Sequence, residues 1–393
     1  MKIALVSPYD FSYPGGVVRH ITSLEYHFTR MGHVVKIIAP ASSPVTGYGD
    51  RFIPIGKPRP IPASGSIARI TISLTLAKKV KEVLARENFD IVHLHEPLCP
   101  TLCTTVLRKS KTTNIGTFHA AESKPSYRWT KPVLMNGLYK KWFKKLDGRI
   151  AVSKPARDFI NKHFPASYNI IPNGVELEHF SQEVAPLEEF QDGKINILFL
   201  GRAEKRKGLE YLLKAYQLIK PDHPDCRLIV VSPKTRARRK YEKQVSEANL
   251  QDVVFVDGRS VTDKEKPRYY RTADIFCAPS TGHESQGVVL LEAMATGKPV
   301  VASNISGYAS VVTNEVEGLL VPPKQEVPLA QAVTRLMQDA PLRRQMGERG
   351  RAKAADYGWE QISRKVMDYY IKILMNKTKQ ETLNSKPTAL PDS

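Results

Sequence analysis

The sequence contains little cysteine and no long hydrophobic run. Its four cysteines, Cys99, Cys103, Cys226 and Cys277, are scattered among 393 residues. Their spacing fits neither a zinc site nor a disulfide framework, which indicates a reducing compartment. No segment approaches the roughly 20 apolar residues that cross a bilayer, and the apolar run at the amino terminus is too short for a signal peptide. We therefore expect a cytoplasmic protein whose contact with a membrane is peripheral.

Acidic residues are also scarce relative to basic ones. The chain has 59 Lys and Arg against 39 Asp and Glu, which gives a formal charge of +20. Residues 1–172 hold 26 basic and 10 acidic residues, a net charge of +16, whereas the other 33 basic and 29 acidic residues leave +4. This excess in the first half indicates an anionic partner: a membrane surface, a nucleic acid or an acidic substrate. The alternative is that the charge serves only solubility.

Two familiar ligand-binding patterns are missing. The pair Gly15 and Gly16 does not extend to Gly-x-Gly-x-x-Gly, so a dinucleotide cofactor is not expected. No Asp-x-Asp metal motif is evident either. What is present is an alternation of short apolar runs, as at 3–6 and 34–39, with helical patterns, as at 17–31. With a length of 393 residues, this alternation predicts an α/β protein of two domains.

The stretch 275–297 predicts a ligand-binding helix end. An apolar run at 275–278 ends at Pro279, a loop follows, and a helix without a breaker runs over 288–295. The free N–H groups and the dipole of that helix favour a phosphate. Glu284 in the loop and Glu292 in the helix could accept hydrogen bonds from a sugar and a ribose. The alternative is an ordinary capped helix with a surface glutamate.

A second cue follows the predicted strand 195–200. Gly201 and Gly208 bracket Arg202 and Lys207 at the carboxyl end of that strand. An arginine offers a planar fork to a diphosphate, and a lysine offers a point charge. The alternative is that these exposed basic residues only solubilise the protein.

These motifs together resemble family 4 retaining glycosyltransferases. Glu284 and, after seven residues, Glu292 are followed by Ala-Met-Ala-Thr-Gly-Lys-Pro-Val-Val-Ala-Ser, and the resemblance extends over about residues 1–375. It implies the GT-B fold, in which two facing Rossmann-like, doubly wound domains enclose a deep cleft. The implied units are an acceptor-binding domain at 1–172, a nucleotide-sugar-binding domain at 173–358, a helix crossing back at 359–376 and a disordered tail at 377–393.

The resemblance also implies roles for particular residues. The catalytic residues would be His119, Arg202, Lys207 and Glu284. The donor would contact Gly15, Gly16, Arg202, Lys207, Val261, Lys264, Glu284, Gln286, Gly287, Val288 and Glu292. The acceptor would contact Tyr9, Arg69 and Lys124. For Arg69 a surface salt bridge is the alternative.

Two lysine-rich segments have helical periodicity. At 74–86, Leu76, Val80 and Val83 share one face, and the resemblance assigns Lys78, Lys79 and Lys81 to an anionic membrane surface. The alternative is that the apolar face belongs to the core and the lysines face water. For 133–146 we favour that alternative, core packing with a basic rim.

The function implied by this resemblance is transfer of mannose from GDP-mannose to a phosphatidylinositol-type membrane lipid, with retention of anomeric configuration. No metal is expected, and His93, His95 and Glu96, which follow one another near a strand end, are not assigned one. No cofactor beyond the nucleotide sugar is expected. The first alternative is a family 4 enzyme that uses a UDP-sugar, such as UDP-glucose or UDP-glucuronate, with a diacylglycerol or soluble acceptor. A basic nucleic-acid-binding protein is disfavoured because the chain lacks the corresponding motifs.

Overall fold

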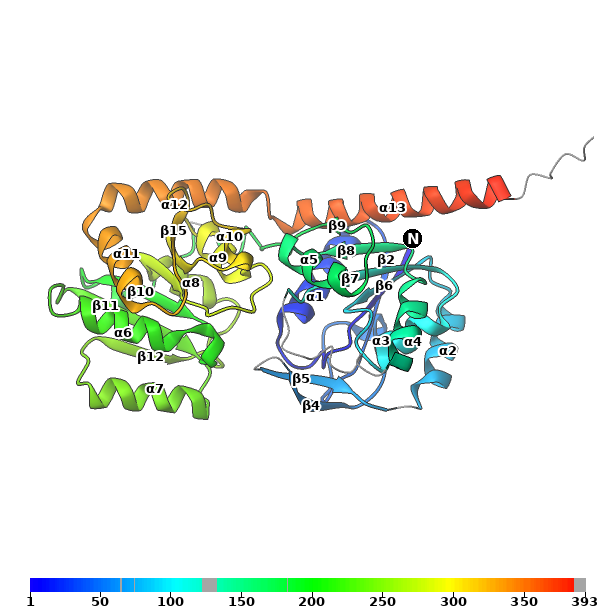
Figure 1. Ribbon diagram of the computed structural model, residues 1–393, viewed down its shortest axis with the longest axis horizontal. Coiled ribbons are helices and arrows are strands. Elements are labelled where there is room, and N and C mark those ends of the chain that lie inside the picture. The colour runs from blue at the N-terminus through cyan, green and yellow to red at the C-terminus, as the bar shows by residue number, and fades with distance from the viewer. Residues whose placement is uncertain (64–65, 74, 122–132, 182, 385–393) are drawn as a thin grey trace, which may run out of the picture.

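The computed structural model describes residues 1–63, 66–73, 75–121, 133–181 and 183–384, and it has two α/β domains (Figure 1). Each domain contains one parallel sheet with helices on its faces. The two sheets occupy residues 2–170 and 195–321, so the predicted two-domain α/β architecture is confirmed.

The first sheet has the strand order β3-β2-β1-β6-β7-β8-β9. Its strands are β1 (Lys2–Val6), β2 (Val34–Ala39), β3 (Phe52–Pro54), β6 (Ile91–His95), β7 (Thr113–Phe118), β8 (Gly148–Ala151) and β9 (Asn169–Ile170). The helices are α1 (Gly16–Arg30), α2 (Leu76–Glu87), α3 (Leu102–Lys109), α4 (Val133–Phe143) and α5 (Lys154–His163). Alternate residues of β1 enter two different cores, since Ile3 packs toward α1 and Ala4 toward α2 and α3.

The second sheet has the order β12-β11-β10-β13-β14-β15. Its strands are β10 (Ile195–Leu200), β11 (Cys226–Ser232), β12 (Val253–Asp257), β13 (Ile275–Ala278), β14 (Val300–Ser303) and β15 (Gly318–Val321). The helices are α6 (Leu209–Ile219), α7 (Arg236–Glu247), α8 (Lys266–Thr272), α9 (Val288–Ala295), α10 (Ser306–Ala309), α11 (Glu326–Gln338) and α12 (Ala340–Ala355).

The chain crosses between the domains twice, at adjacent points. Val175 N–H donates to Tyr357 O at 2.8 Å, and Trp359 N–H donates to Val175 O at 3.2 Å. Helix α13 (Trp359–Asn384) then runs along the first domain (Figure 1), where the Tyr370 hydroxyl lies 2.6 Å from His93 Nδ1. This is the segment for which a helix returning to the first domain is expected from the sequence.

The prediction of a disordered tail from residue 377 was wrong for residues 377–384, because α13 continues to Asn384. This segment contains Lys, Gln, Glu and Leu and no Gly or Pro, so local propensity favours continuing the helix. Residues 385–393 lie outside the described part of the chain.

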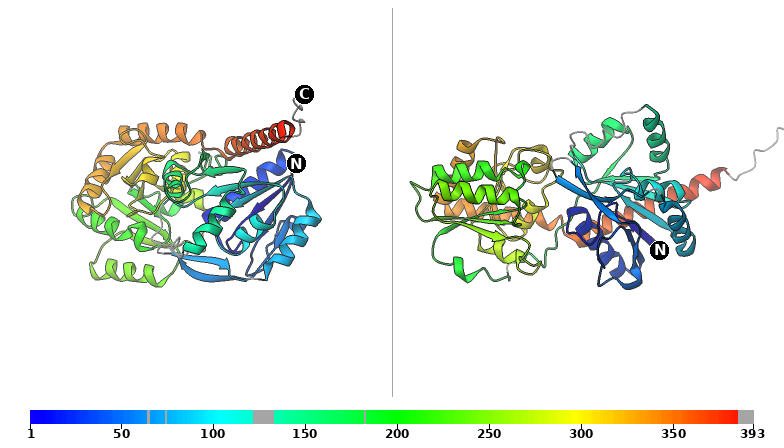
Figure 2. Two further views of the ribbon diagram at one scale, coloured as in Figure 1. Left: turned by 45° about the vertical axis from the view of Figure 1, so that its right-hand side comes forward. Right: turned by 90° about the horizontal axis from the view of Figure 1, so that it is seen from below.

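The proline-containing stretch after β3 forms a hairpin. Strands β4 (Pro58–Ala63) and β5 (Ser66–Thr71) pair antiparallel in a separate two-stranded sheet, which extends from the first domain toward the second (Figures 1 and 2). Three prolines alternate along β4, at Pro58, Pro60 and Pro62. They read as loop signals, yet proline is tolerated in an edge strand because it need not donate to a ladder there.

The four cysteines are free thiols. Among the helices of the described residues, none combines the length and the apolar composition needed to traverse a bilayer.

Candidate active site

The site lies where the strand order of each sheet reverses. In the first sheet this point falls between β1 and β6, and in the second between β10 and β13. Ligands of doubly wound sheets bind outside the carboxyl ends of the strands at such points. The predicted residues Gly15 and Gly16 follow β1, Arg202 and Lys207 follow β10, and Glu284 follows β13. Both domains therefore present the predicted groups at the edge where ligands are expected.

Glu284 is partly buried between two cations. Its Oε1 lies 2.7 Å from Lys207 Nζ and 2.6 Å from Arg206 Nη1, and its side chain is 13% exposed. Burial opposes ionisation of this carboxyl, but the charges and hydrogen bonds of Lys207 and Arg206 outweigh burial, so the pKa of Glu284 is lowered. Glu284 is therefore a carboxylate, held in one position.

Arg202 belongs to the same network. Its Nη1 lies 3.0 Å from Glu204 Oε1, and the other carboxylate oxygen of Glu204 lies 3.0 Å from Arg206 Nε. Since Arg206 also contacts Glu284, the residues form one continuous set of ion pairs. The structure thus brings together the basic loop after β10 and the acidic loop after β13.

Backbone contacts hold these two loops against each other. Gly208 has φ +71°, and a Cβ at that position would lie 1.9 Å from Pro279 O. Thr281 N–H donates to Arg206 O at 2.8 Å. On the other side, a Cβ on Gly307 would lie 1.9 Å from Glu284 O. Glycine is required at both positions, because a side chain on Gly208 would displace the loop at Pro279 and a side chain on Gly307 would displace the loop at Glu284.

Glu292 lies inside the second domain, and a residue of the first domain contacts it. The Tyr270 hydroxyl donates to Oε2 at 2.7 Å, while Lys266 Nζ and Arg19 Nη1 lie 2.5 and 3.0 Å from Oε1. Burial opposes ionisation, but Lys266 and Arg19 outweigh it, so the pKa of Glu292 is lowered. Arg19 also reaches Asp263 at 3.1 Å. An ion pair therefore spans the gap between the domains.

Two helix amino termini that carry predicted residues have open N–H groups. Helix α1 starts at Gly16 and α9 at Val288, and no described side chain caps either helix. A Cβ on Gly15 or Gly16 would meet no atom within 4 Å, so the space beside this turn is open to a ligand. Gly287 has φ +77°, and a Cβ there would lie 2.6 Å from Tyr308.

The Gln286 side chain is already bonded within the protein. Its Oε1 accepts from Asn173 N and Nδ2, both at 2.7 Å, and its Nε2 donates to Asn173 O at 3.0 Å. If Gln286 contacts the expected nucleotide-sugar donor, the contact is therefore made by its backbone. Val261 is half-buried and Lys264 exposed in the β12–α8 loop, which also contains Asp263, a partner of Arg19.

His119 is fixed by its backbone. Its N–H and that of Ala120 donate to Glu96 Oε1 at 2.7 and 3.0 Å, and its Nε2 lies 3.1 Å from His95 Nδ1. His20, on α1, lies with its ring centroid 4.9 Å from that of His119. Imidazole rings therefore meet here, and the Glu96 carboxyl holds the backbone beside them.

Burial keeps these histidines neutral. It lowers the pKa of His20 to about 4 and that of His93 to about 3, and it lowers the pKa of His95 and His119 well below 6.5. The same four residues are close in space, so protonation of one disfavours protonation of its neighbours. At neutral pH each ring therefore has one N–H and one lone pair.

This cluster predicts loss of stability in mild acid. Between the folded pKa of about 4 for His20 and its unfolded value near 6.5, only the unfolded chain binds the proton. The contribution of these histidines to the free energy of unfolding is therefore fully present above pH 6.5. It falls as pH drops toward 4, by up to about 1.4 kcal/mol per pH unit for each such histidine. Urea unfolding of chelator-treated protein should show this slope, and His20→Gln should reduce it. An equal reduction in the control His163→Gln, at an exposed position, would contradict the assignment.

The predicted acceptor residue Tyr9 lies beside the hairpin β4–β5, and Arg69 is part of its strand β5. Tyr9 forms an antiparallel bridge with Ile70, and Asp10 N–H donates to Arg69 O at 2.8 Å. The Arg69 guanidinium lies 4.5 Å from the centre of the Tyr13 ring. Lys124, the third predicted acceptor residue, lies outside the described residues.

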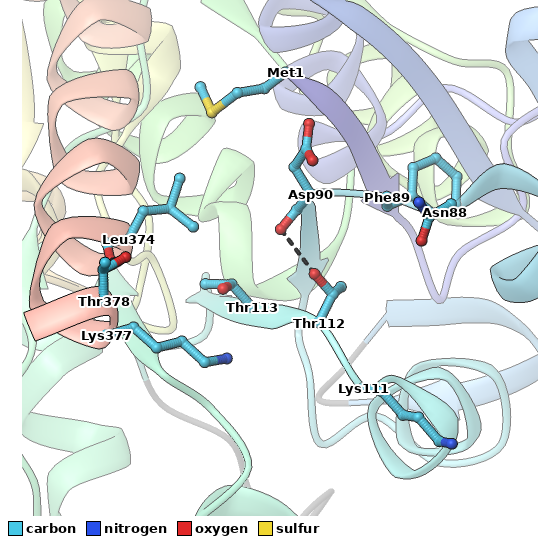
Figure 3. A pocket seen from close by; sticks show the side chains of 10 residues that line it. All are labelled: Met1, Asn88, Phe89, Asp90, Lys111, Thr112, Thr113, Leu374, Lys377 and Thr378. Carbon is cyan, nitrogen blue, oxygen red and sulfur yellow. Dashed lines mark hydrogen bonds between the residues drawn. The ribbon is translucent and has the colours of Figure 1, made fainter. Parts of the chain in front are cut away.

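A cavity of 710 Å³ lies between the domains next to Glu284. Ala121 and Asp158 line it from the first domain, and Thr281 and Ser306 line it from the second. Another cavity, shown in Figure 3, lies where α13 passes Met1 and Asp90, and Thr112 Oγ1 donates there to Asp90 O at 2.8 Å. The residues lining that second cavity include none of the predicted site residues.

The lysine-rich helix α2 has its apolar face in the core. Leu76, Val80 and Val83 are buried, whereas Lys78 and Lys81 are exposed. Lys79 Nζ donates to Pro54 O at 2.9 Å. The apolar stripe is thus used for folding, and only the lysines are presented to the surroundings. In α4 and the turn after it, Tyr139, Phe143 and Leu146 are buried, which confirms core packing there.

Several residues of the site were missed in the sequence. They are Arg19, His20, Asn173, Arg206, Lys266 and Tyr270. Arg206 lies directly beside Lys207 and could have been found from that position. Nothing in the local sequence relates Arg19 to Glu292, since the two are 273 residues apart and meet only when the domains face each other.

Comparison with known families covers nearly the whole chain. Residues 14–179 match Glycosyltransferase Family 4, and residues 182–353 match Glycosyl transferases group 1. The Phosphatidyl-myo-inositol mannosyltransferase of Mycobacterium tuberculosis is 34% identical over 375 residues, which cover 94% of this chain and 96% of that protein. The protein of the same name from Propionibacterium freudenreichii is 34% identical over 379 residues, with 94% of each chain covered.

Solved structures show the same fold. Sucrose-phosphate synthase from Thermosynechococcus elongatus superposes with a TM-score of 0.75 at 23% identity, covering 95% of this chain and 99% of that one. HepE from Anabaena in complex with UDP gives a TM-score of 0.74 at 17% identity, covering 94% and 99%. At these sequence identities the comparison shows that the fold is shared, and nothing about function.

Proposed function

Because this chain belongs to glycosyltransferase family 4 and is a glycosyltransferase, we propose that it transfers mannose from GDP-mannose to a phosphatidylinositol-type membrane lipid. The observation that carries the proposal is the joint position of Glu284, Lys207 and Arg202 at the carboxyl edge of the second sheet. Such a group can hold sugar hydroxyls through the carboxylate while the cations bind the diphosphate beside them.

The proposed chemistry depends on charge that develops as the diphosphate leaves. Arg202, Lys207 and the open amino terminus of α9 would stabilise the negative charge on the leaving group. With these groups fixed in place, transfer is proposed to be independent of a metal ion. Gly15 and Gly16 leave room for the phosphates to approach the backbone at the start of α1.

Retention of configuration is proposed with the leaving phosphate as the base. The phosphate oxygen would accept the proton of the attacking acceptor hydroxyl on the same face of the sugar. Glu284 is held as a carboxylate by Lys207 and Arg206, so it accepts hydrogen bonds rather than supplying a proton. His119 would contact the sugar from the first domain as a neutral imidazole.

The lipid acceptor is proposed from three features. The relatives that match almost the whole chain are named for phosphatidyl-myo-inositol, the first domain carries most of the positive charge, and Arg69 lies beside the loop of Tyr9. An inositol phosphate is an anion that an arginine fork binds well. The enzyme would act at the inner face of the cell membrane, attached peripherally.

Nucleotide selectivity tests the donor. We expect GDP to raise the melting temperature by about 5 °C at a hundredfold excess over its Kd, since such binding adds about 2.7 kcal/mol. UDP and ADP should give much smaller shifts, and radiolabelled GDP-mannose should label a phosphatidylinositol extract. A larger shift with UDP, and transfer from UDP-glucose to diacylglycerol or a soluble acceptor, would replace this proposal by the alternative one.

Vesicle flotation tests membrane attachment. Each Lys near an anionic surface contributes about 1 kcal/mol, so Lys78→Glu with Lys81→Glu should weaken binding to phosphatidylserine vesicles by at least about tenfold. Lys240→Glu, at an exposed position of α7 in the second domain, is the matched control and should bind normally. Binding to duplex DNA but not to vesicles would refute a membrane acceptor.

A further inference from the structure

Three histidines meet at the carboxyl edge of the first sheet. His20 lies on α1, His95 is the last residue of β6, and His119 directly follows β7. One ring nitrogen of each lies within 4.8 Å of one nitrogen of both others. Their ring centroids are 4.9 to 5.3 Å apart. The cluster lies at the point where the strand order reverses, and half-buried His119 is its most accessible member.

The hydrogen bonds around Asn173 fix the tautomer of His20. Asn173 N–H can only donate, so the Gln286 atom that it contacts is oxygen. The Asn173 side-chain atom that shares this oxygen must then be its amide nitrogen. The remaining Asn173 atom, Oδ1, faces His20 Nδ1 at 2.8 Å and accepts its proton. His20 Nε2 therefore carries a lone pair.

The other two rings also offer lone pairs. His95 Nδ1 and His119 Nε2 are 3.1 Å apart, and at most one of these nitrogens carries a proton in a hydrogen bond between them. Two ligand nitrogens on a tetrahedral Zn²⁺ are separated by about 3.4 Å. His95 Nε2 is buried and has no hydrogen-bond partner among the described residues. Within the described residues, the His95 ring nitrogen that has a partner is therefore Nδ1, which faces His119.

We propose that His20, His95 and His119 bind one Zn²⁺, or a similar divalent transition-metal ion, through three neutral imidazoles, with the fourth position open to the cleft. Neutral imidazole nitrogens select Zn²⁺, Cu²⁺ or Ni²⁺ over Mg²⁺, which prefers oxygen. The carbonyl oxygen of Asn173 that accepts from His20 Nδ1 is the usual outer support of a ligating histidine.

Such an ion would inhibit transfer rather than assist it. It would bind a ring nitrogen of His119, and the proposed function places this ring against the transferred sugar. It would also be bound in the first domain, whereas Lys207 and Arg202, the proposed partners of the diphosphate, belong to the second. Metal binding itself does not rest on the proposed function, and only the inhibition does.

Titration of the chelator-treated full chain with Co²⁺ and Zn²⁺ tests the site. We expect one equivalent of Co²⁺ to give the visible absorption of a tetrahedral centre, and Zn²⁺ to displace it. His20→Ala and His119→Ala should each weaken binding about 100-fold, while the exposed control His163→Ala should bind like the original chain. His95 is left unchanged because it is fully buried and its removal would disturb folding. Circular dichroism spectra and melting temperatures of all three variants verify that they fold.

Absence of a one-to-one Co²⁺ signal, or an unchanged affinity in folded His20→Ala and His119→Ala, would overturn the site. In the transfer assay, one equivalent of Zn²⁺ should abolish product formation and a chelator should restore it. Full activity at saturating Zn²⁺ would overturn the inhibition. If no nucleotide sugar is turned over in any condition, the proposed function fails while the Co²⁺ titration still reports on the site.

Discussion

Lys207→Ala should lower kcat about 100- to 1,000-fold, the range found when one group that stabilises transition-state charge is removed. The Lys207 ammonium lies 2.7 Å from Glu284 and is 17% exposed, so its charge acts in a partly dehydrated site. It would contribute more as the diphosphate leaves than when the intact donor is bound, so kcat should change more than KM.

The variant should fold, because Glu284 retains Arg206 as a partner at 2.6 Å. Lys205→Ala is the matched control: Lys205 belongs to the same short segment between β10 and α6, but its side chain is exposed. Steady-state rates with GDP-mannose, together with melting temperatures, separate a catalytic from a structural effect. A kcat within threefold of the original chain would remove Lys207 from the proposed mechanism.

The central strands of each sheet could be predicted from sequence because they are buried on both faces. The apolar runs at 34–39, 195–200 and 300–303 coincide with β2, β10 and β14. Such runs need no long-range information, since a continuous apolar stretch between turn signals suits a parallel strand. The loops after β10 and β13 were found for a similar reason, since glycines and charged residues follow those strands directly.

What could not be predicted depends on contacts between distant segments. The segment 234–243 is rich in lysine and arginine, a composition typical of a solvated surface, yet Arg238 of α7 is buried and donates to Ser232 O and Val256 O. A basic segment gives no sign that one of its arginines bonds carbonyls at the ends of two strands. The collection of His20 with His95 and His119 is likewise a product of the sheet order, which brings β1, β6 and β7 side by side.

Glu292→Gln should raise the KM for the nucleotide sugar about 100-fold, with a smaller change in kcat. The proposed role of Glu292 is to accept hydrogen bonds from the ribose, and a bond to a charged acceptor contributes about 1.5–3 kcal/mol. The amide keeps the shape of the side chain but leaves Lys266, which is 15% exposed, without its counter-charge. A lower melting temperature should therefore accompany the weaker binding.

Arg19→Ala should have the opposite effect and tighten donor binding by up to about fivefold. Glu292 Oε1 already accepts from Lys266 and Arg19, so both lone pairs of this oxygen are used, and a ribose hydroxyl can bind to it only after one of these two donors leaves. Lys266 belongs to the same domain as Glu292, whereas Arg19 comes from α1 of the other domain and is 45% exposed, so Arg19 is the partner that leaves. Because solvent reaches the Arg19 side of this pair, its contribution is screened toward the value of about 1 kcal/mol found for surface pairs, which limits the gain to that range.

Calorimetric titration with GDP measures both changes, and Arg30→Ala, at an exposed position on the same helix, serves as the control. If Arg19 instead contacts the bound nucleotide, its removal weakens binding, and the interdomain ion pair is then part of the donor site. Tighter binding in Arg19→Ala together with weaker binding in Glu292→Gln would mean that the cleft must give up this cross-domain contact before the donor can occupy it.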